Sequence, residues 1–335
     1  MGELRRDPII GQWVVVATDQ ESLTPKAYER DIRSKTHQAV CQFCPGRESQ
    51  TPPEVDAIRF DGSAANTPGW TARAVPNKFP ALKIEGSLDK RGIGIYDVIN
   101  GIGAHEVIVE TPDHERDLAD LSAQEISCVL RLFLNRGKAL AKDPRFKYIM
   151  VFKNYGESAG ASVEHAHSQL IALPMVPKLV KAELEGAGNY AKFRGRCLFC
   201  DILDQEYADE DRMISQNDKY AVFCPYVPRA PFESWILPKE HESDFFHLKD
   251  DDMMDLAVMI KDVLQRIKIV LGCSYNFYIH TAPVQYKEKE MYHWHIEIVP
   301  NLVKIKGYEW GTGLYMVPTS PAVAAGYLRD VEFST

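Results

Sequence analysis

The chain has 335 residues, long enough for two domains or one large one. Of these residues 45% are hydrophobic and 26% are charged, a composition typical of a globular protein. Its formal net charge of −8 argues against a general nucleic-acid-binding protein, which needs a basic surface. The segment Met1–Asp7 has no apolar signal core, and no apolar run approaches the length of a membrane span. We therefore expect no membrane contact and a cytoplasmic location.

The first half is predicted to alternate between short apolar strands and one long helix. In chain order its elements are a strand at Gln12–Val16, a Cys-x-x-Cys knuckle at Cys41–Cys44, a strand end and turn at Arg73–Pro80, a strand at Glu106–Glu110, a helix from Ser122, a strand at Tyr148–Phe152 and an apolar strand through Ile171–Pro174. Glu125 stands three residues after Ser122, which is the spacing of a capping box at a helix start.

The second half repeats this plan. Its elements are a Cys-x-x-Cys knuckle at Cys197–Cys200, strands at Tyr220–Pro225 and Ser234–Pro238, a helix from Asp250–Asp252 to Gly272, strands at Phe277–His280 and His293–Pro300, a tail through Lys304–Tyr315 and a short helix near Ala322–Val331. The repetition predicts an α+β fold in which a duplicated unit forms a largely antiparallel sheet with packed helices. We place the two halves at residues 1–178 and 179–335.

Each half contains one Cys-x-x-Cys pair followed by two histidines at corresponding positions. A zinc ion is commonly held in a tetrahedron by such a pair together with two histidines. We therefore predict two closed structural zinc sites, with a redox-active cysteine pair or plain reduced cysteines as the alternatives. The predicted ligands are Cys41, Cys44, His114 and His165 in the first half and Cys197, Cys200, His241 and His293 in the second.

The motif His165-x-His167-x-Gln169 follows a loop of small residues, Gly156–Ser162. A strand through the motif would place its three polar side chains on one face, beside a loop whose N–H groups can face phosphate oxygens. If His165 binds metal, His167 is left as the free imidazole. The second pair, His293 and His295, has no glycine loop before it, so we interpret that half as scaffold; we expect His105 and His280 to be structural, with the sugar pocket as the alternative.

The chain resembles the galactose-1-phosphate uridylyltransferase family, within the histidine-triad superfamily, over nearly its whole length. The motifs that carry the resemblance are Arg6-Asp7-Pro8, Gly11–Val14, Cys41-x-x-Cys44, Pro76–Pro80, Pro112-Asp113-His114, Phe152-Lys153-Asn154-x-Gly156, Gly160-x-Ser162, His165-x-His167-x-Gln169 and Gly307-Tyr308-Glu309.

The resemblance implies a role for each matching residue. His167 would attack the α-phosphorus of a nucleoside-diphosphate sugar, and Gln169, which replaces the third histidine of hydrolytic relatives, would hold the nucleotidyl group with Ser162. The other implied substrate contacts are Asn77, Asn154, Gly156 and Gly160, with Lys304, Tyr308 and Glu309 near the hexose phosphate. In the family the tail reaches the site of a partner subunit, which implies a homodimer.

Two departures from the family pattern bear on the substrate. The segment Thr18–Pro25 lacks the arginines usual after the first strand, and Trp310–Gly313 lacks the usual downstream glutamine. The resemblance implies exchange of a nucleotidyl group between a nucleoside-diphosphate hexose and hexose-1-phosphate, of the UDP-glucose and galactose-1-phosphate type. The alternatives are an ADP-glucose phosphorylase with inorganic phosphate as acceptor, a hydrolase of the histidine-triad type, and a zinc-stabilised nucleotide-binding protein without turnover.

Overall fold

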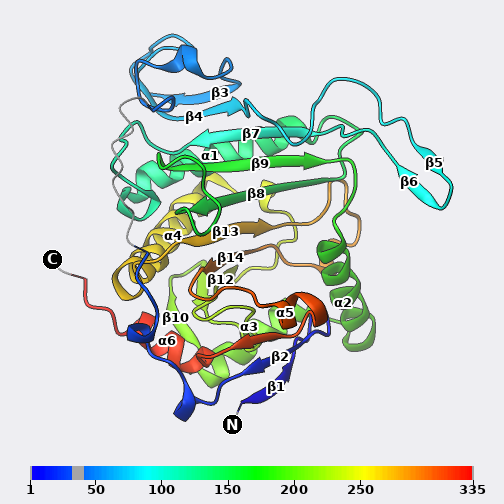
Figure 1. Ribbon diagram of the computed structural model, residues 1–335, viewed down its shortest axis with the longest axis vertical. Coiled ribbons are helices and arrows are strands. Elements are labelled where there is room, and N and C mark those ends of the chain that lie inside the picture. Colours follow the sequence, from blue (N-terminus) through cyan, green and yellow to red (C-terminus); the bar gives the residue numbers. More distant parts are fainter. Residues whose placement is uncertain (1, 32–40, 334–335) are drawn as a thin grey trace.

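The strands of both halves join in one antiparallel sheet in the computed structural model, which describes residues 2–31 and 41–333. From one edge to the other the sheet contains β10 (Met213–Gln216), β11 (Tyr220–Phe223), β12 (Ser234–Pro238), β14 (His295–Pro300), β13 (Tyr275–His280), β8 (Tyr148–Tyr155), β9 (His167–Leu173), β7 (Ala104–Val109), β4 (Trp70–Pro76) and β3 (Asp56–Arg59) (Figure 1).

The strand order shows the duplication directly. The first half runs β3-β4-β7-β9-β8 and the second runs β10-β11-β12-β14-β13, and the halves meet where β8 pairs with β13. The cross-strand register is also repeated, because Gln169 lies opposite Phe152 as Glu297 lies opposite Tyr278. The predicted α+β fold with a duplicated unit is confirmed, while the division at residue 178 stays a prediction because the sheet continues across it.

Two long helices cover one face of the sheet. α1 (Ala123–Leu140) begins at the predicted capping box, where the Ser122 hydroxyl accepts the Glu125 N–H and the Glu125 carboxylate accepts the Ser122 N–H. α4 (Asp250–Val270) begins with three aspartates, which suit the positive end of a helix dipole. Both bury their apolar stripe in the main core, and α6 (Pro321–Arg329) packs beside α4.

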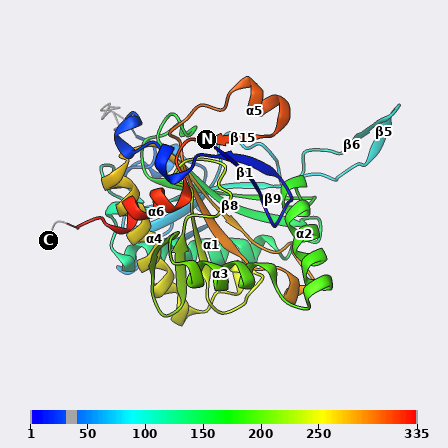
Figure 2. The same cartoon turned by 90° about the horizontal axis from the view of Figure 1, so that it is seen from below.

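The opposite face of the sheet is covered mainly over its second half (Figure 2). Residues of α2 (Lys178–Arg194) and α3 (Leu198–Asp209) pack there against β11 and β12. α5 (Gly307–Thr312) and a small sheet of β1 (Glu3–Arg6), β2 (Trp13–Val16) and β15 (Tyr315–Val317) lie together at the top of Figure 2. A hairpin of β5 (Arg91–Ile93) and β6 (Tyr96–Val98) projects from the body of the molecule. Among the described residues, no helix has the length and apolar character to cross a bilayer.

Candidate functional site

The first predicted metal-binding group comes together at the start of β9. Cys41, Cys44, His114 and His165 bring one ligand atom each within 4.8 Å of one another. Nδ1 of His165 lies 3.6 Å from Sγ of Cys41 and 3.3 Å from Nδ1 of His114. Zinc–ligand bond lengths give edges of about 3.5 Å between N and S and about 3.3 Å between two N atoms in a tetrahedron, so the four residues fit such an ion.

The second predicted group has the same form. Cys197, Cys200, His241 and His293 also lie within 4.8 Å of one another. Sγ of Cys200 lies 3.4 Å from Nδ1 of His241 and 3.6 Å from Nδ1 of His293. Here Cys197 is the N-cap of α3, so the second cysteine pair opens a helix rather than a separate knuckle. Each group offers two thiols and two imidazoles, which are compatible with zinc.

His167 lies at the first position of β9, two residues after His165 of the first candidate metal-binding group. The strand begins there rather than at His165, so the two imidazoles do not share the strand face as the sequence suggested. The Nδ1–H of His167 donates to the carbonyl oxygen of His165 at 2.8 Å, which leaves Nε2 with its lone pair. Burial, assisted by the nearby charge of Lys153, lowers the pKa of His167 to about 4. The ring is therefore neutral at pH 7 and suited to nucleophilic attack.

A buried ion pair supports the same strand from the helix-covered face. The Lys153 ammonium donates to Glu110 at 2.7 Å and to the carbonyl oxygen of His167 at 3.0 Å. Ser168 donates to the other oxygen of Glu110. The main-chain carbonyl of His167 is thus held by the Lys153 ammonium, and Glu110 links that ammonium to Ser168.

Three amides lie on the open face of the first half. Gln169 is two residues beyond His167 on β9, and its Oε1 lies 2.8 Å from Nε2 of His105. Nδ2 of Asn77 lies 3.2 Å from the same ring nitrogen. The Oδ1 of Asn154 accepts a hydrogen bond from Asn276 at 2.9 Å, which turns the Asn154 amide nitrogen away from that partner.

The loop Gly156–Ser162 depends on its glycines. Gly156 has φ +83°, and a Cβ there would lie 1.9 Å from Oγ of Ser274. Gly160 has φ +90°, and a Cβ there would lie 3.6 Å from Nδ2 of Asn154. The N–H groups of Gly160 and Ala161 donate to carbonyls inside the loop, so these two do not face a ligand as we expected. Ser162 is exposed at the loop end.

The corresponding position in the second half is closed. His295 lies where His167 lies in the first half, but its ring stacks on Trp235 with centroids 4.9 Å apart. Its Nε2 is 3.3 Å from Glu297, which is also paired with Arg229. With no free nitrogen and no glycine loop, this histidine is not arranged as a nucleophile.

Glu183, His280, His295 and Glu297 form a third buried group whose ligand atoms lie within 4.8 Å of one another and can hold a metal ion. The sequence did not reveal this group, because Glu183 is on α2, which was not predicted, and the carboxylates are distant in the chain. His280 Nδ1 and the Tyr292 hydroxyl each lie 2.8 Å from Oε2 of Glu183. The sequence alone could show only that His295 and Glu297, two residues apart, lie on the same face of one strand.

The helix that carries two of the predicted tail residues lies away from β9 in the same chain. α5, which carries Tyr308 and Glu309, lies over the lower part of the sheet in Figure 1, whereas β9 lies in its upper part. Glu309 is buried, and its carboxylate accepts the N–H groups of Lys306 and Met316 at 2.7 Å and 3.0 Å. Tyr308 and Lys304 are exposed.

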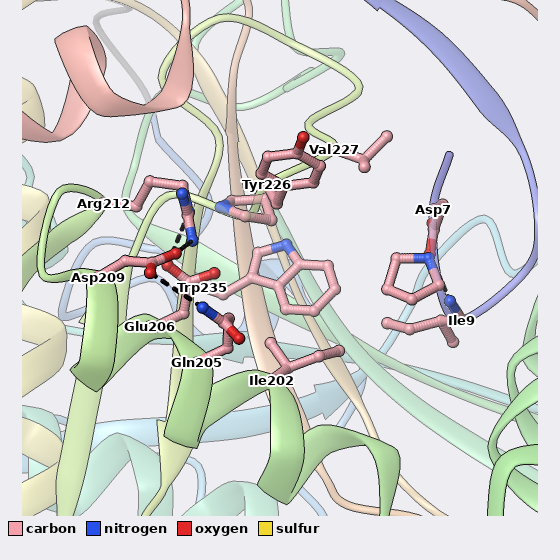
Figure 3. A pocket seen from close by; sticks show the side chains of 12 residues that line it. Asp7, Ile9, Ile202, Gln205, Glu206, Asp209, Arg212, Tyr226, Val227 and Trp235 are labelled. Atoms are coloured by element: carbon pink, nitrogen blue, oxygen red, sulfur yellow. Dashed lines mark hydrogen bonds and ion pairs between the residues drawn. The ribbon is translucent and has the colours of Figure 1, made fainter. Parts of the chain in front are cut away.

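A cavity of about 350 Å³ lies between α3, β12 and the N-terminal segment (Figure 3). Trp235 and Ile202 provide apolar walls, and Arg212 pairs with Glu206 and Asp209 at its side. None of the predicted catalytic residues lines this cavity, so it is separate from the site around His167.

A buried, neutral imidazole beside several amides is suited to the transfer of a phosphate-linked group. Family models of the galactose-1-phosphate uridyl transferase N-terminal and C-terminal domains match residues 2–177 and 183–317. The chain belongs to the galactose-1-phosphate uridylyltransferase family.

Individual relatives cover almost the whole chain. The chain is 34% identical to ADP-glucose phosphorylase of Arabidopsis thaliana, over 99% of this chain and 93% of that protein. It is 25% identical to galactose-1-phosphate uridylyltransferase of Thermotoga maritima, over 99% of both. The crystal structure of ADP-glucose phosphorylase from Arabidopsis thaliana with bound ADP-glucose matches with a TM-score of 0.83 at 34% identity, covering 99% of this chain and 100% of that one.

Both relatives are nucleotidyltransferases, and this chain is a nucleotidyltransferase enzyme of the same type. The predicted family, fold class and enzyme class are confirmed. The alternative of a nucleotide-binding protein without turnover is set aside. The assignment of individual site residues stays a prediction.

Proposed function

We propose that the chain transfers a nucleoside monophosphate group from a nucleoside-diphosphate hexose to a second phosphate through Nε2 of His167. The observation that supports this proposal is the neutral ring of His167, whose Nδ1 is engaged and whose Nε2 has no hydrogen-bond partner among residues 2–31 and 41–333. Attack by Nε2 forms a P–N bond and breaks the P–O bond to the hexose-1-phosphate, which leaves. The positive charge of the substituted ring is stabilised by the Nδ1–H bond to the His165 carbonyl.

In the second step a phosphate oxygen of the acceptor attacks the same phosphorus. The P–N bond breaks and its electron pair returns to Nε2, so the enzyme is restored. Splitting the exchange in two lets donor and acceptor use one site in turn. Gln169, Asn154 and Ser162 are proposed to donate to the non-bridging oxygens, and Asn77 to contact the nucleotide side with Gly156 and Gly160 shaping the loop.

Two pairs of substrates fit this scheme. The sequence favoured a UDP-hexose with hexose-1-phosphate as acceptor. The 34% identity to a protein named ADP-glucose phosphorylase, against 25% to a uridylyltransferase, supports an ADP-hexose with inorganic phosphate. The segment Thr18–Pro25, which has no arginine, departs from the uridylyltransferase pattern. We propose the ADP-hexose pair as the physiological one and keep the UDP-hexose pair as the second candidate.

A donor panel tests the proposal. UDP-glucose and ADP-glucose, each labelled in the α-phosphate, are incubated with the protein, first alone and then with inorganic phosphate or galactose-1-phosphate. We expect label on the denatured protein with a donor alone, and its release as nucleotide by the true acceptor. The variant His167→Asn should remain unlabelled, whereas label on that variant would place the nucleophile elsewhere.

We also propose that each Cys2His2 group binds one zinc ion. We further propose that the protein is a homodimer, in which the exposed Lys304 and Tyr308 reach the hexose-phosphate side of the partner's site. The fit of the first group to a tetrahedron supports zinc. The separation of α5 from β9 within one chain supports the dimer. Metal analysis and light scattering test these two statements, and the cytoplasmic location stays a prediction.

A further inference from the structure

His105 lies beside Gln169 on the strand that pairs with β9. It is the second residue of β7, opposite Ile171, and its ring shares the open face of the sheet with Gln169. The ring nitrogen Nε2 lies 2.8 Å from Oε1 of Gln169. The proposed reaction gives this contact no role, although it is the polar contact made by the amide that would hold the phosphate.

The main chain determines which ring nitrogen of His105 carries the hydrogen. The backbone N–H of Ala81 donates to Nδ1 of His105 at 3.2 Å. A backbone amide cannot exchange its nitrogen and oxygen, so Nδ1 must be the acceptor and Nε2 must carry the hydrogen of a neutral ring. The Nε2–H group then donates to Oε1 of Gln169, which is a pure acceptor.

This hydrogen bond fixes the orientation of the Gln169 amide. With Oε1 held by His105, the amide nitrogen points to the other side, and within the described part of the chain it makes no hydrogen bond. We propose that His105 is a positioning residue that presents the NH2 group of Gln169 to the non-bridging oxygens of the phosphate. The inference rests on the proposed function, in which His167 attacks that phosphate.

Asn77 is oriented by the same arrangement. Its Oδ1 accepts the N–H of Phe79 at 2.9 Å, so its amide nitrogen is the atom 3.2 Å from Nε2 of His105. Because Nε2 of His105 carries a hydrogen and donates it to Gln169, it has no lone pair that could accept a hydrogen bond from Asn77. The Asn77 amide hydrogens are left for a ligand, and the main-chain N–H of Asn77 donates to the His105 carbonyl at 2.8 Å, which keeps both residues in place.

An apolar residue at position 105 would remove the hydrogen bond that sets the orientation of the Gln169 amide. The amide of Gln169 would then be free to turn, and in its reversed orientation the carbonyl oxygen would face the charged phosphate. A hydrogen-bond donor that is wrongly placed stabilises the transition state only weakly, and its misplacement lowers the rate by about 10-fold to 100-fold. The effect should fall on the chemical step rather than on donor binding.

The test uses His105→Leu and His105→Gln in the full-length, metal-loaded protein. Glutamine can place a side-chain N–H at the reach of Nε2, and leucine cannot. We expect His105→Leu to slow formation of nucleotidyl-His167 by about 10-fold to 100-fold in single-turnover experiments, with donor Kd, metal content and Tm close to wild type. His105→Gln should recover most of the rate.

The pair His105→Leu and Gln169→Ala completes a double-mutant cycle. If His105 acts through Gln169, adding His105→Leu to Gln169→Ala causes no further loss. A wild-type rate in His105→Leu, or losses that multiply in the double variant, would overturn the inference. Absence of any labelled His167 in the wild-type protein would instead overturn the proposed function, so the two failures are distinguishable.

Discussion

The ring of His167 is buried, donates from Nδ1 to a carbonyl and lies near the positive charge of Lys153. Burial and that charge both disfavour the imidazolium form, which lowers the pKa to about 4 from an ordinary 6.5. Between these two values an unfolded chain binds a proton that the folded protein does not. The free energy of unfolding should therefore fall as the pH falls from 6.5 towards 4, by up to about 1.4 kcal/mol per pH unit, and should be unaffected by this group above 6.5.

The same shift predicts the acid limit of the reaction. We expect the single-turnover rate of nucleotidyl-His167 formation to stay level from pH 8 down to about pH 5 and to fall below that, since Nε2 keeps its lone pair until the ring is protonated. Metal content and circular dichroism at each pH serve as controls for loss of structure. An acid limb centred near 6.5 would show that burial does not control this ring.

Individual residues were predictable where identity and spacing alone define the chemistry. The eight candidate metal ligands were predicted in this way, because a thiol pair with two imidazoles has few other uses, and the structure brings each group of four together. The role of His167 stays a prediction. The hydrogen-bond partners of Gln169 and Asn154 could not be predicted in this way. His105 and Asn276 reach them only through the register of β7 against β9 and of β13 against β8, which local sequence does not determine.

Among the elements, the loop Gly156–Ser162 gives a sharp test of backbone requirements. Gly156→Ala must place a Cβ 1.9 Å from Oγ of Ser274 in addition to the strain of φ +83°. Gly195, the C-cap of α2, has φ +75° with no atom within 4 Å of its ideal Cβ. Gly195→Ala therefore carries only the backbone strain of about 1 kcal/mol, and Gly156→Ala should cost several times more.

Urea unfolding of the two glycine variants measures the difference. We also expect Gly156→Ala to slow nucleotidyl transfer, because the loop connects Asn154 to Ser162, and Gly195→Ala to leave it unchanged. Equal loss of stability in both variants would show that Ser274 moves aside and that the close approach is unimportant.

The elements that the sequence predicted well have strong local signals. α1 has a capping box and a regular apolar stripe, and α4 has an acidic first turn. α2 was missed because its N-cap is Pro177, with no side-chain cap, and because few of its residues are buried. The β5–β6 hairpin was also missed, since most of its strand residues are exposed and therefore do not follow an apolar pattern.

At the scale of the whole molecule, duplication gives the two metal groups different importance. The first group contains His165, whose carbonyl holds His167, whereas the second belongs to the half without a free nucleophile. Cys44→Ser should therefore lower the rate of nucleotidyl-His167 formation by at least about 10-fold, a loss typical of damaged metal sites. Cys200→Ser should lose one metal ion and lower Tm, yet retain most of that rate per folded chain.

Metal analysis, thermal unfolding and single-turnover labelling, each on both variants, check this difference. The comparison is internally controlled because both substitutions remove the second cysteine of a Cys-x-x-Cys pair. If the two variants lose labelling to the same extent, the second half contributes to catalysis and is more than scaffold.

The last prediction follows from the proposed homodimer, in which each site would combine the proposed nucleophile of one chain with the tail of the other. His167→Asn removes the proposed nucleophile and leaves the tail intact. The double variant Lys304→Ala/Tyr308→Ala changes two exposed side chains of the tail and leaves His167 intact. Each protein alone should exchange nucleotidyl groups poorly, since every site in a symmetric dimer then lacks one part.

Co-expression of the two variants with different affinity tags should restore activity. A mixed dimer has one site with both defects and one site with none, so random pairing should return about a quarter of the wild-type activity, concentrated in protein that carries both tags. Exchange with the true acceptor is the readout, because the tail lies on the hexose-phosphate side. Inactive mixed dimers, or a fully active tail variant, would show that the tail does not complete the partner's site.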